Sequence, residues 1–291
     1  MTEFDYHRPI DFLAEREPFR DRTGNSIVDV NTLFLTGRRC PIGCNMCDLH
    51  VFTREDSPPV GATVDQIDHA LQRLPPASWI KLYNSGNFFD AASLPPADYD
   101  AIARRCEPFD RVIVENHPKI GRHRHLDFAR RLRGKLEVAV GLESVQPRVL
   151  SRIGKRMTRD EFDRYAGWLT ANDIDLRVFL IIGSPGIKTP EAVRWAKLSL
   201  RHAIAVGARH ISLLPVRNGA GWGEDRRPLP TLTLQTLCEV FDDAIASTQH
   251  CCISIDLWEF KHQTLQPSDQ NRLRCLSGAI LEQRAVMHEA V

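Results

Sequence analysis

Six short apolar runs recur along the chain and restrict its fold more than any other feature. Each is rich in Val, Ile and Leu, and each is followed by a segment of helical spacing before the next run begins. Continuous apolar strands that alternate with helices are typical of parallel sheets joined by right-handed crossovers. The sequence therefore predicts an α/β protein built on a partial (β/α)6 TIM-like barrel. The six expected strands are residues 32–36, 79–83, 111–115, 136–142, 176–182 and 210–214.

The chain length suits one such barrel with short additions at both ends. It has 291 residues, of which 43% are hydrophobic, and it shows no clear linker or second domain. A short polar helix is expected at 8–20 and a turn at 21–25. A helix near 233–247 and a strand near 252–258 are expected late in the chain, before a final helix. The expected parts are an N-terminal helical cap, the barrel and a C-terminal α/β extension packed on it, at residues 1–30, 31–220 and 221–291.

The charge composition gives no general case for a nucleic-acid or membrane-surface partner. Lys and Arg number 38 against 37 Asp and Glu, so the formal net charge is +1. Basic residues gather between 122 and 133, and we interpret them as a solvated helix face rather than as a tRNA-binding surface. No run approaches the length of a membrane span, and the charged N-terminal segment does not resemble a signal peptide. Eight cysteines without such a signal predict a cytoplasmic protein.

Three cysteines follow the first expected strand within one short loop. Cys40, Cys44 and Cys47 have the spacing C-x3-C-x2-C. A disulfide framework is improbable in a chain of this length and compartment, and buried inert thiols seldom gather in a loop containing Gly and Pro. Structural zinc needs a fourth ligand, which His50 could supply. An iron–sulfur cluster held by three thiolates leaves one iron open, and we favour this interpretation over zinc.

Polar and glycine residues also follow the other expected strands. In barrels of parallel strands the carboxyl ends of the strands meet at one rim, where active sites form. These residues are therefore expected to lie around the cysteine loop. They are Asn84, Ser85, Gly86, Glu115, Asn116, His117, Glu143, Ser144, Gly183, Ser184, Arg217 and Asn218.

With these motifs together, the chain resembles the radical S-adenosylmethionine (SAM) enzymes. The C-x3-C-x2-C loop after the first strand is the signature of that superfamily, and the resemblance extends over about residues 30–220. Within it, the chain is most similar to the branch that holds the archaeosine synthase radical subunit, elongator-type enzymes and oxygen-independent coproporphyrinogen oxidase. The matching segments are residues 115–118, 141–144, 149–158 and 182–186.

The resemblance implies a set of cofactor-binding residues but no catalytic residue. Cys40, Cys44 and Cys47 would ligate a [4Fe–4S] cluster whose open iron chelates SAM. Glu115 and Glu143 would accept hydrogen bonds from the ribose hydroxyls. The other positions implied are Ser85 and Gly86 at the methionyl amine, Lys155 (or its neighbour Arg156) at the SAM carboxylate, and Gly183 and Met46 near the adenine. Residues 84–87 lack the carboxylate that the family usually carries there.

The same resemblance implies reductive cleavage of SAM to a 5′-deoxyadenosyl radical that takes a hydrogen atom from a substrate. An electron donor such as flavodoxin or ferredoxin is expected, and the substrate is either a small biosynthetic molecule or a modified nucleobase or tRNA. Candidates to reach it are His50, His117, Arg217, Asn218 and Trp222.

Two other functions stay open at this point. One is a non-catalytic iron–sulfur or zinc-binding interaction protein on the same barrel, and the other is a zinc hydrolase, which His-rich strand ends would favour. The remaining cysteines are expected to be scattered buried thiols: Cys106, Cys238, Cys251, Cys252 and Cys275.

Overall fold

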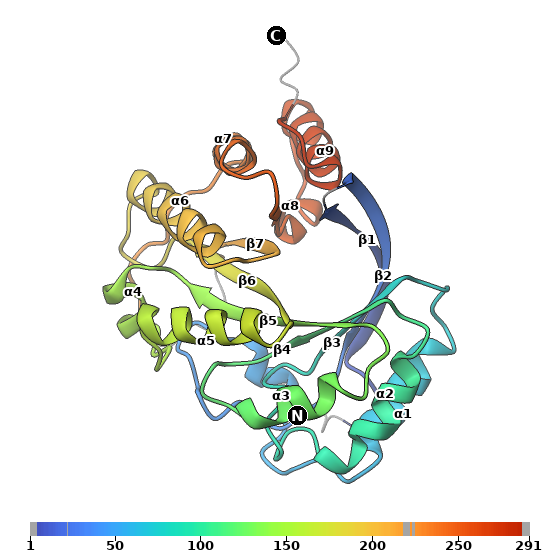
Figure 1. Cartoon of the computed structure of the whole chain (residues 1–291). Helices are drawn as coiled ribbons and strands as arrows, with labels where there is room; N and C mark the ends of the chain where they lie inside the picture. Colours follow the sequence, from blue (N-terminus) through green and yellow to red (C-terminus); the bar gives the residue numbers. More distant parts are fainter. Residues whose placement is uncertain (1–4, 22, 218–221, 223–224, 287–291) are drawn as a thin grey trace.

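A computed structural model describes residues 5–21, 23–217, 222 and 225–286. Its centre is one strongly curved sheet of eight strands in the spatial order β1 to β8, with helices around the outside (Figure 1). All neighbours from β2 to β8 are parallel, and β1 pairs antiparallel with β2. The fold is thus the predicted partial barrel, nearly closed. The strands are β1 (Asp11–Asp21), β2 (Gly24–Phe34), β3 (Trp79–Tyr83), β4 (Arg111–Glu115), β5 (Lys135–Glu143), β6 (Asp175–Ile182), β7 (His210–Pro215) and β8 (Cys252–Ile255).

The expected N-terminal helix at 8–20 is wrong, because this segment is strand β1. It pairs with β2 over its whole length, from Asp11 opposite Phe34 to Asp21 opposite Gly24, and the chain reverses at the predicted turn. Glu15 and Glu17 lie two residues apart and therefore point to the same face of the strand, which is the barrel interior. The N-terminal region is accordingly a hairpin within the sheet rather than a helical cap.

The helices cover the outer face of the sheet and follow the predicted order. Helix α5 begins with a complete capping box, in which Thr158 and Glu161 each bind the other's backbone N–H. The C-terminal segment joins the barrel through β8, and α9 packs on β1, β2 and β8. The helices are α1 (Ala62–Leu71), α2 (Tyr99–Cys106), α3 (Arg122–Ala129), α4 (Pro147–Arg152), α5 (Arg159–Ala171), α6 (Thr189–Ala205), α7 (Leu234–Ala246), α8 (Trp258–Lys261) and α9 (Pro267–Glu282), with 3₁₀ turns η1 (Leu49–Phe52) and η2 (Pro96–Asp98).

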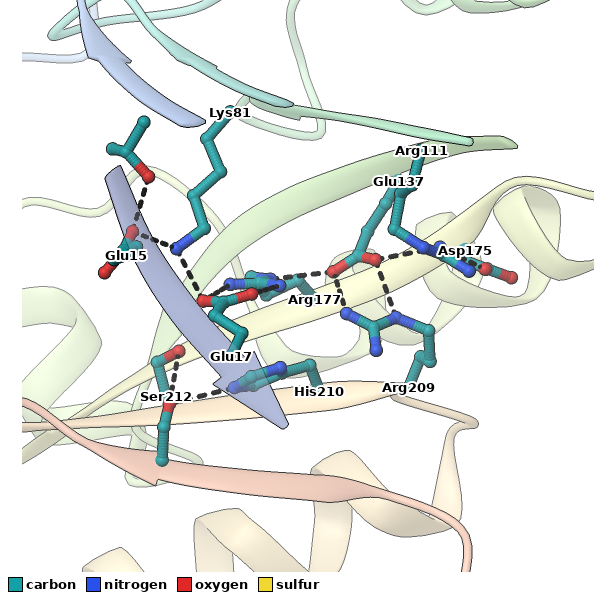
Figure 2. A network of polar contacts seen from close by, with 12 residues as sticks. Glu15, Glu17, Lys81, Arg111, Glu137, Asp175, Arg177, Arg209, His210 and Ser212 are labelled. Atoms are coloured by element: carbon teal, nitrogen blue, oxygen red, sulfur yellow. Dashed lines mark hydrogen bonds and ion pairs between the residues drawn. The ribbon is translucent and has the colours of Figure 1, made fainter. Parts of the chain in front are cut away.

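The two faces of the sheet carry different cores. Outward-facing residues such as Leu82, Val112 and Val138 are buried against the helices in one large apolar cluster. Inward-facing residues near the start of the strands are charged instead, and they form the buried network in Figure 2. Four cations and four carboxylates make up this ionic layer: Lys81, Arg111, Arg177 and Arg209 with Glu15, Glu17, Glu137 and Asp175.

Glu137 and Glu17 are the centres of the ionic layer. Glu137 is fully buried and accepts four hydrogen bonds from Arg111, Arg177 and Arg209, at 2.6 to 2.9 Å. Arg177 also binds both oxygens of Glu17, at 2.8 and 2.7 Å, and so ties β6 to β1 across the barrel. Burial alone would raise the pKa of Glu137, but Arg209, Arg177 and Arg111 together hold it well below its ordinary value. Glu137 is therefore ionised and paired with its three arginines at neutral pH.

Above the ionic layer, rings fill the barrel. Tyr83 lies between Phe34 and Phe179, with ring centroids 6.4 and 6.2 Å away. These three rings and Ala139 form the floor of a cavity that opens at the carboxyl ends of the strands. The ionic layer thus closes one end of the barrel and leaves the other end hollow.

The five remaining cysteines do not line this cavity. Cys106, Cys238 and Cys251 belong to the outer apolar core, and Cys275 packs against it. Cys252 lies opposite His210 in the register of β7 and β8, so its side chain shares the inward face of His210. Neighbouring strand residues alternate between the two faces, and Cys251 accordingly points outward. Among the described residues, no helix is both long enough and apolar enough to cross a membrane.

Candidate functional site

The candidate site is a cavity of about 490 Å³ at the carboxyl ends of the parallel strands. It draws side chains from the cysteine loop after β2 and from the ends of β3, β4, β5, β6 and β7. Of the predicted cofactor-binding residues, all but Gly183 and the alternative Arg156 line it: Cys40, Cys44, Cys47, Met46, Ser85, Gly86, Glu115, Glu143 and Lys155.

The three cysteines are free thiols in a half-buried loop. Gly43 adopts a left-handed φ of 64° in the turn, and the Cys47 N–H donates to the Cys44 carbonyl at 3.1 Å. Asn45 anchors the loop on α4, because its backbone N–H and side-chain amide donate to the carbonyls of Ile153 and Arg152. The loop therefore presents its thiols to the cavity from a fixed turn.

Burial makes two of these thiols, Cys44 and Cys47, poor anions on their own. It raises the pKa of Cys47 to about 11 and also raises the pKa of Cys44, which the Lys155 cation partly offsets. A metal centre that binds thiolates would supply the missing positive charge. The donor set is three sulfurs, which is the chemistry of iron–sulfur clusters.

Single-metal binding is less well supported. Within the described part of the chain, no three His, Cys, Asp or Glu side chains lie close enough to share one metal ion. His50, the candidate fourth zinc ligand, is half-buried, lies outside the cavity and directs Nδ1 to the Cys47 carbonyl at 3.0 Å. A cluster has several irons, so its cysteines do not have to share one ion.

The segment after β3 connects the cysteines to the next strand end. Ser85 has a φ of 54°, and the Gly86 N–H donates to Glu115 Oε1 at 3.1 Å. Asn87 is almost fully buried, donates from Nδ2 to Cys40 Sγ at 3.0 Å and accepts the His117 N–H on Oδ1 at 2.7 Å. Asn87 was missed as a site residue in the sequence, although it occupies the position where the carboxylate of the family pattern is absent.

Glu115 ends β4 and is balanced between two protonation states. Burial raises its pKa to about 7, and the backbone N–H groups of Gly86, Ser85 and Asn84 hold it from rising further. At neutral pH the side chain can therefore both accept and donate a hydrogen bond in the cavity.

Glu143 and Lys155 form a buried ion pair beside the cysteines. Lys155 Nζ lies 2.7 Å from Glu143 Oε1, and the carboxylate raises the pKa of Lys155 against the opposing effect of burial. The pair lies over Gly141, where a Cβ would come within 2.2 Å of Glu143 Oε1, so a larger residue there would displace the pair. Glu143 Oε2 is buried with no hydrogen-bond partner among the described residues. A buried acceptor without a partner is what a bound hydroxyl would satisfy.

Three of the predicted positions differ from the simplest expectation. Lys155 is paired with Glu143 rather than free, and Arg156 is exposed. Gly183 has a φ of 101°, which favours glycine, but Pro230 and Val216 pack where its side chain would be, and Gly183 does not line the cavity. An approach of adenine to Gly183 would therefore require these two residues to move, and Val216 itself lines the cavity instead.

His117 holds the backbone of Lys155 in place. Burial lowers the pKa of His117 to about 4, so the ring is neutral at pH 7. Its Nδ1 accepts the Lys119 N–H at 3.3 Å, which leaves Nε2 to donate to the Lys155 carbonyl at 3.0 Å. His117, Arg217 and Trp222 line the cavity, whereas Asn218 lies outside the described residues.

Comparisons with solved structures agree with the fold described above. No protein-family model matches the sequence. A curated relative, an uncharacterized protein of Methanocaldococcus jannaschii, is 24% identical over 228 residues, which cover 72% of this chain and 61% of that protein. Streptococcus suis SuiB bound to its precursor peptide SuiA superimposes with a TM-score of 0.55 at 10% identity, over 75% of this chain and 46% of SuiB. Methylornithine synthase (PylB) gives 0.54 at 9% identity, over 83% of this chain and 79% of that enzyme.

SuiB and PylB are radical SAM enzymes, and this chain has the fold of that superfamily. The predicted resemblance is thereby confirmed at the level of the fold. This chain spans about three fifths of its curated relative and about half of SuiB, so activity and substrate are matters for proposal.

Proposed function

We propose that this protein is a radical SAM enzyme that binds a [4Fe–4S] cluster and S-adenosylmethionine in the described cavity. One observation carries the proposal: the three cysteine thiols, Glu115 and the unpartnered Glu143 Oε2 all face the same hollow end of the barrel. Neither a structural zinc site nor a packed barrel would need that combination.

The chain's own residues have distinct tasks in this proposal. Cys40, Cys44 and Cys47 would hold the cluster, and the backbone at Ser85 and Gly86 would receive the methionyl amine. Glu143 Oε2 would accept a ribose hydroxyl, with Oε1 kept in place by Lys155. When bound, cluster and SAM together supply a 5′-deoxyadenosyl radical, formed by one-electron cleavage that also yields methionine, and this radical takes a hydrogen atom from a substrate carbon.

The surrounding residues would position these groups and limit water. Asn87 would donate to a cluster thiolate through the contact it makes with Cys40 Sγ. The floor of Phe34, Tyr83 and Phe179 is apolar and separates the site from the ionic layer. Such a floor would help to keep water away from a reactive radical.

The fold relatives support the cofactors without defining a substrate. SuiB has been crystallised with S-adenosylmethionine, and that structure superimposes here with a TM-score of 0.51. An electron donor such as flavodoxin or ferredoxin would be required. The substrate would be a small biosynthetic molecule or a modified nucleobase, and no described feature favours tRNA.

Anaerobic reconstitution with iron and sulfide tests the cluster. The wild-type protein should take up about four irons per chain and show thiolate-to-iron charge-transfer absorption. A Cys44→Ala variant should lose most of this iron. The matched control is Cys106→Ala, because Cys106 is buried in the outer core away from the cavity. Zinc at one per chain, or equal iron in the two variants, would contradict the proposal.

A further inference from the structure

One wall of the cavity carries none of the residues assigned above to the cluster, the methionyl amine or the ribose. It is formed by the ends of β6 and β7 and by the start of the segment after β8. Phe179, Leu214 and Val216 make it apolar, and the floor ring of Tyr83 continues it. Such a wall suits the apolar body of a second ligand.

Arg217 and Asp256 place two charges on this wall. Asp256 follows β8 and is fixed by the Trp258 N–H, which donates to its Oδ1 at 2.9 Å. Arg217 follows β7, and its guanidinium lies 3.6 Å from Asp256 Oδ2 and over the ring of Trp258 at 5.5 Å. Both charged side chains are more than a third exposed, 43% and 36%. A contact this long between exposed groups is a weak ion pair.

The other cation of the cavity is already committed. Lys155 is buried against Glu143 at 2.7 Å. Among the described residues that line the cavity, Arg217 is therefore the cation whose donors are largely unused. A guanidinium presents five N–H donors in a planar fork that matches carboxylate and phosphate oxygens.

We infer that Arg217 anchors an anionic group of the substrate, whose apolar or aromatic body lies along the Tyr83 and Phe179 rings. The substrate class is an organic acid, with a carboxylate or a phosphate ester as the charged group. This inference rests on the proposed function, since it places the substrate in the cavity that SAM shares. Asp256 and Trp258 hold the guanidinium ready on the wall.

Calorimetric titration with three matched small molecules tests the inference. The probes are 3-phenylpropionate, its neutral analogue 3-phenylpropionamide, and 2-phenylethyl phosphate. At least one anion should bind about tenfold more tightly than the amide, as one charge-assisted guanidinium contact provides. The phosphate and carboxylate arms identify which anion the subsite prefers.

Variants assign the preference to Arg217. Arg217→Gln should abolish the preference for the anion, and Arg217→Lys should retain part of it because the charge stays without the fork. The matched control is Arg201→Gln, because Arg201 forms a similar loose pair with Asp243 at 3.4 Å on the outer surface. This control should bind all three probes as the wild type does.

The outcomes separate this inference from the proposed function. Each titration is run on the reconstituted protein with SAM and on the protein without cluster. Equal binding of anion and amide, no binding of any probe, or a preference that survives in Arg217→Gln overturns the subsite. A failure to take up cluster or SAM overturns the proposed function instead, and it is measured on the same samples.

Discussion

Replacing Glu137 by Gln should destabilise the fold strongly, because Glu137 is the centre of the ionic layer (Figure 2). The carboxylate is fully buried and accepts four hydrogen bonds from three arginines. Glutamine keeps the shape but removes one of the four negative charges, so the layer retains an excess cation in a buried place. Breaking a buried charge network in this way costs about 3–5 kcal/mol. That is a large part of the roughly 5–15 kcal/mol that holds a typical domain folded.

Urea unfolding followed by far-ultraviolet circular dichroism measures the effect on cluster-free, reduced protein. The loss should be constant between about pH 6 and pH 8. The folded-state pKa of Glu137 lies well below the reference value of 4.5, so its contribution is fully present above that value and is lost only as pH falls below it. The control is Glu55→Gln, since the Glu55 side chain is 80% exposed in its pair with Arg39 and should matter far less.

A double variant keeps the prediction testable even if Glu137→Gln fails to fold. Combining Glu137→Gln with Arg209→Met removes one charge of each sign and restores neutrality, so the double variant should be more stable than Glu137→Gln alone. The coupling should exceed about 1 kcal/mol, as for residues within one network. A loss below about 1 kcal/mol in Glu137→Gln, or a double variant that simply adds both losses, would refute the reasoning.

Two further predictions concern the site. Asn87→Ala removes the hydrogen bond to Cys40 Sγ, so the reduction potential of the reconstituted cluster should fall. The expected fall is about 40 mV, the equivalent of a hydrogen bond of about 1 kcal/mol. An EPR-monitored redox titration that finds the potential unchanged or higher would contradict the assigned contact. For Glu115, whose pKa is raised to about 7 from 4.5, the folded state binds the proton more tightly than the unfolded state. The unfolding free energy of cluster-free protein should therefore fall as pH rises from about 5 to about 7, and the slope should be smaller in Glu115→Gln. Urea titrations at several pH values check this, and parallel slopes in both proteins would exclude Glu115 as their source.

The strands that the sequence predicted best are those with continuous apolar runs. Strands β3 and β4 have the expected bounds, because helices cover one face and the interior rings and ion pairs fill the other. Strand β1 was predicted as a helix because Glu15, Arg16 and Glu17 read as a solvated polar segment. The partners that make this segment a strand, Lys81 and Arg177, come from positions 66 and 160 residues away along the chain, which no local pattern shows.

The site was predictable where a residue type acts through its position at a strand end. The cysteine loop, Glu115 and Glu143 meet in one cavity because parallel strands end at one rim. Asn87, the Glu143–Lys155 pair and Asp256 depend on tertiary contacts instead. Gly183 shows the same limit, since the resemblance placed it near the adenine but could not show that Pro230 and Val216 pack against it.

Formation of 5′-deoxyadenosine tests the central claim most directly. The reconstituted protein is reduced with dithionite under anaerobic conditions, given SAM, and assayed by liquid chromatography and mass spectrometry. The account predicts 5′-deoxyadenosine and methionine in equal amounts from the wild-type protein, and none above background from a variant with Cys40, Cys44 and Cys47 all changed to Ala. A protein that carries the cluster but leaves SAM intact, or equal product from the triple variant, would contradict it.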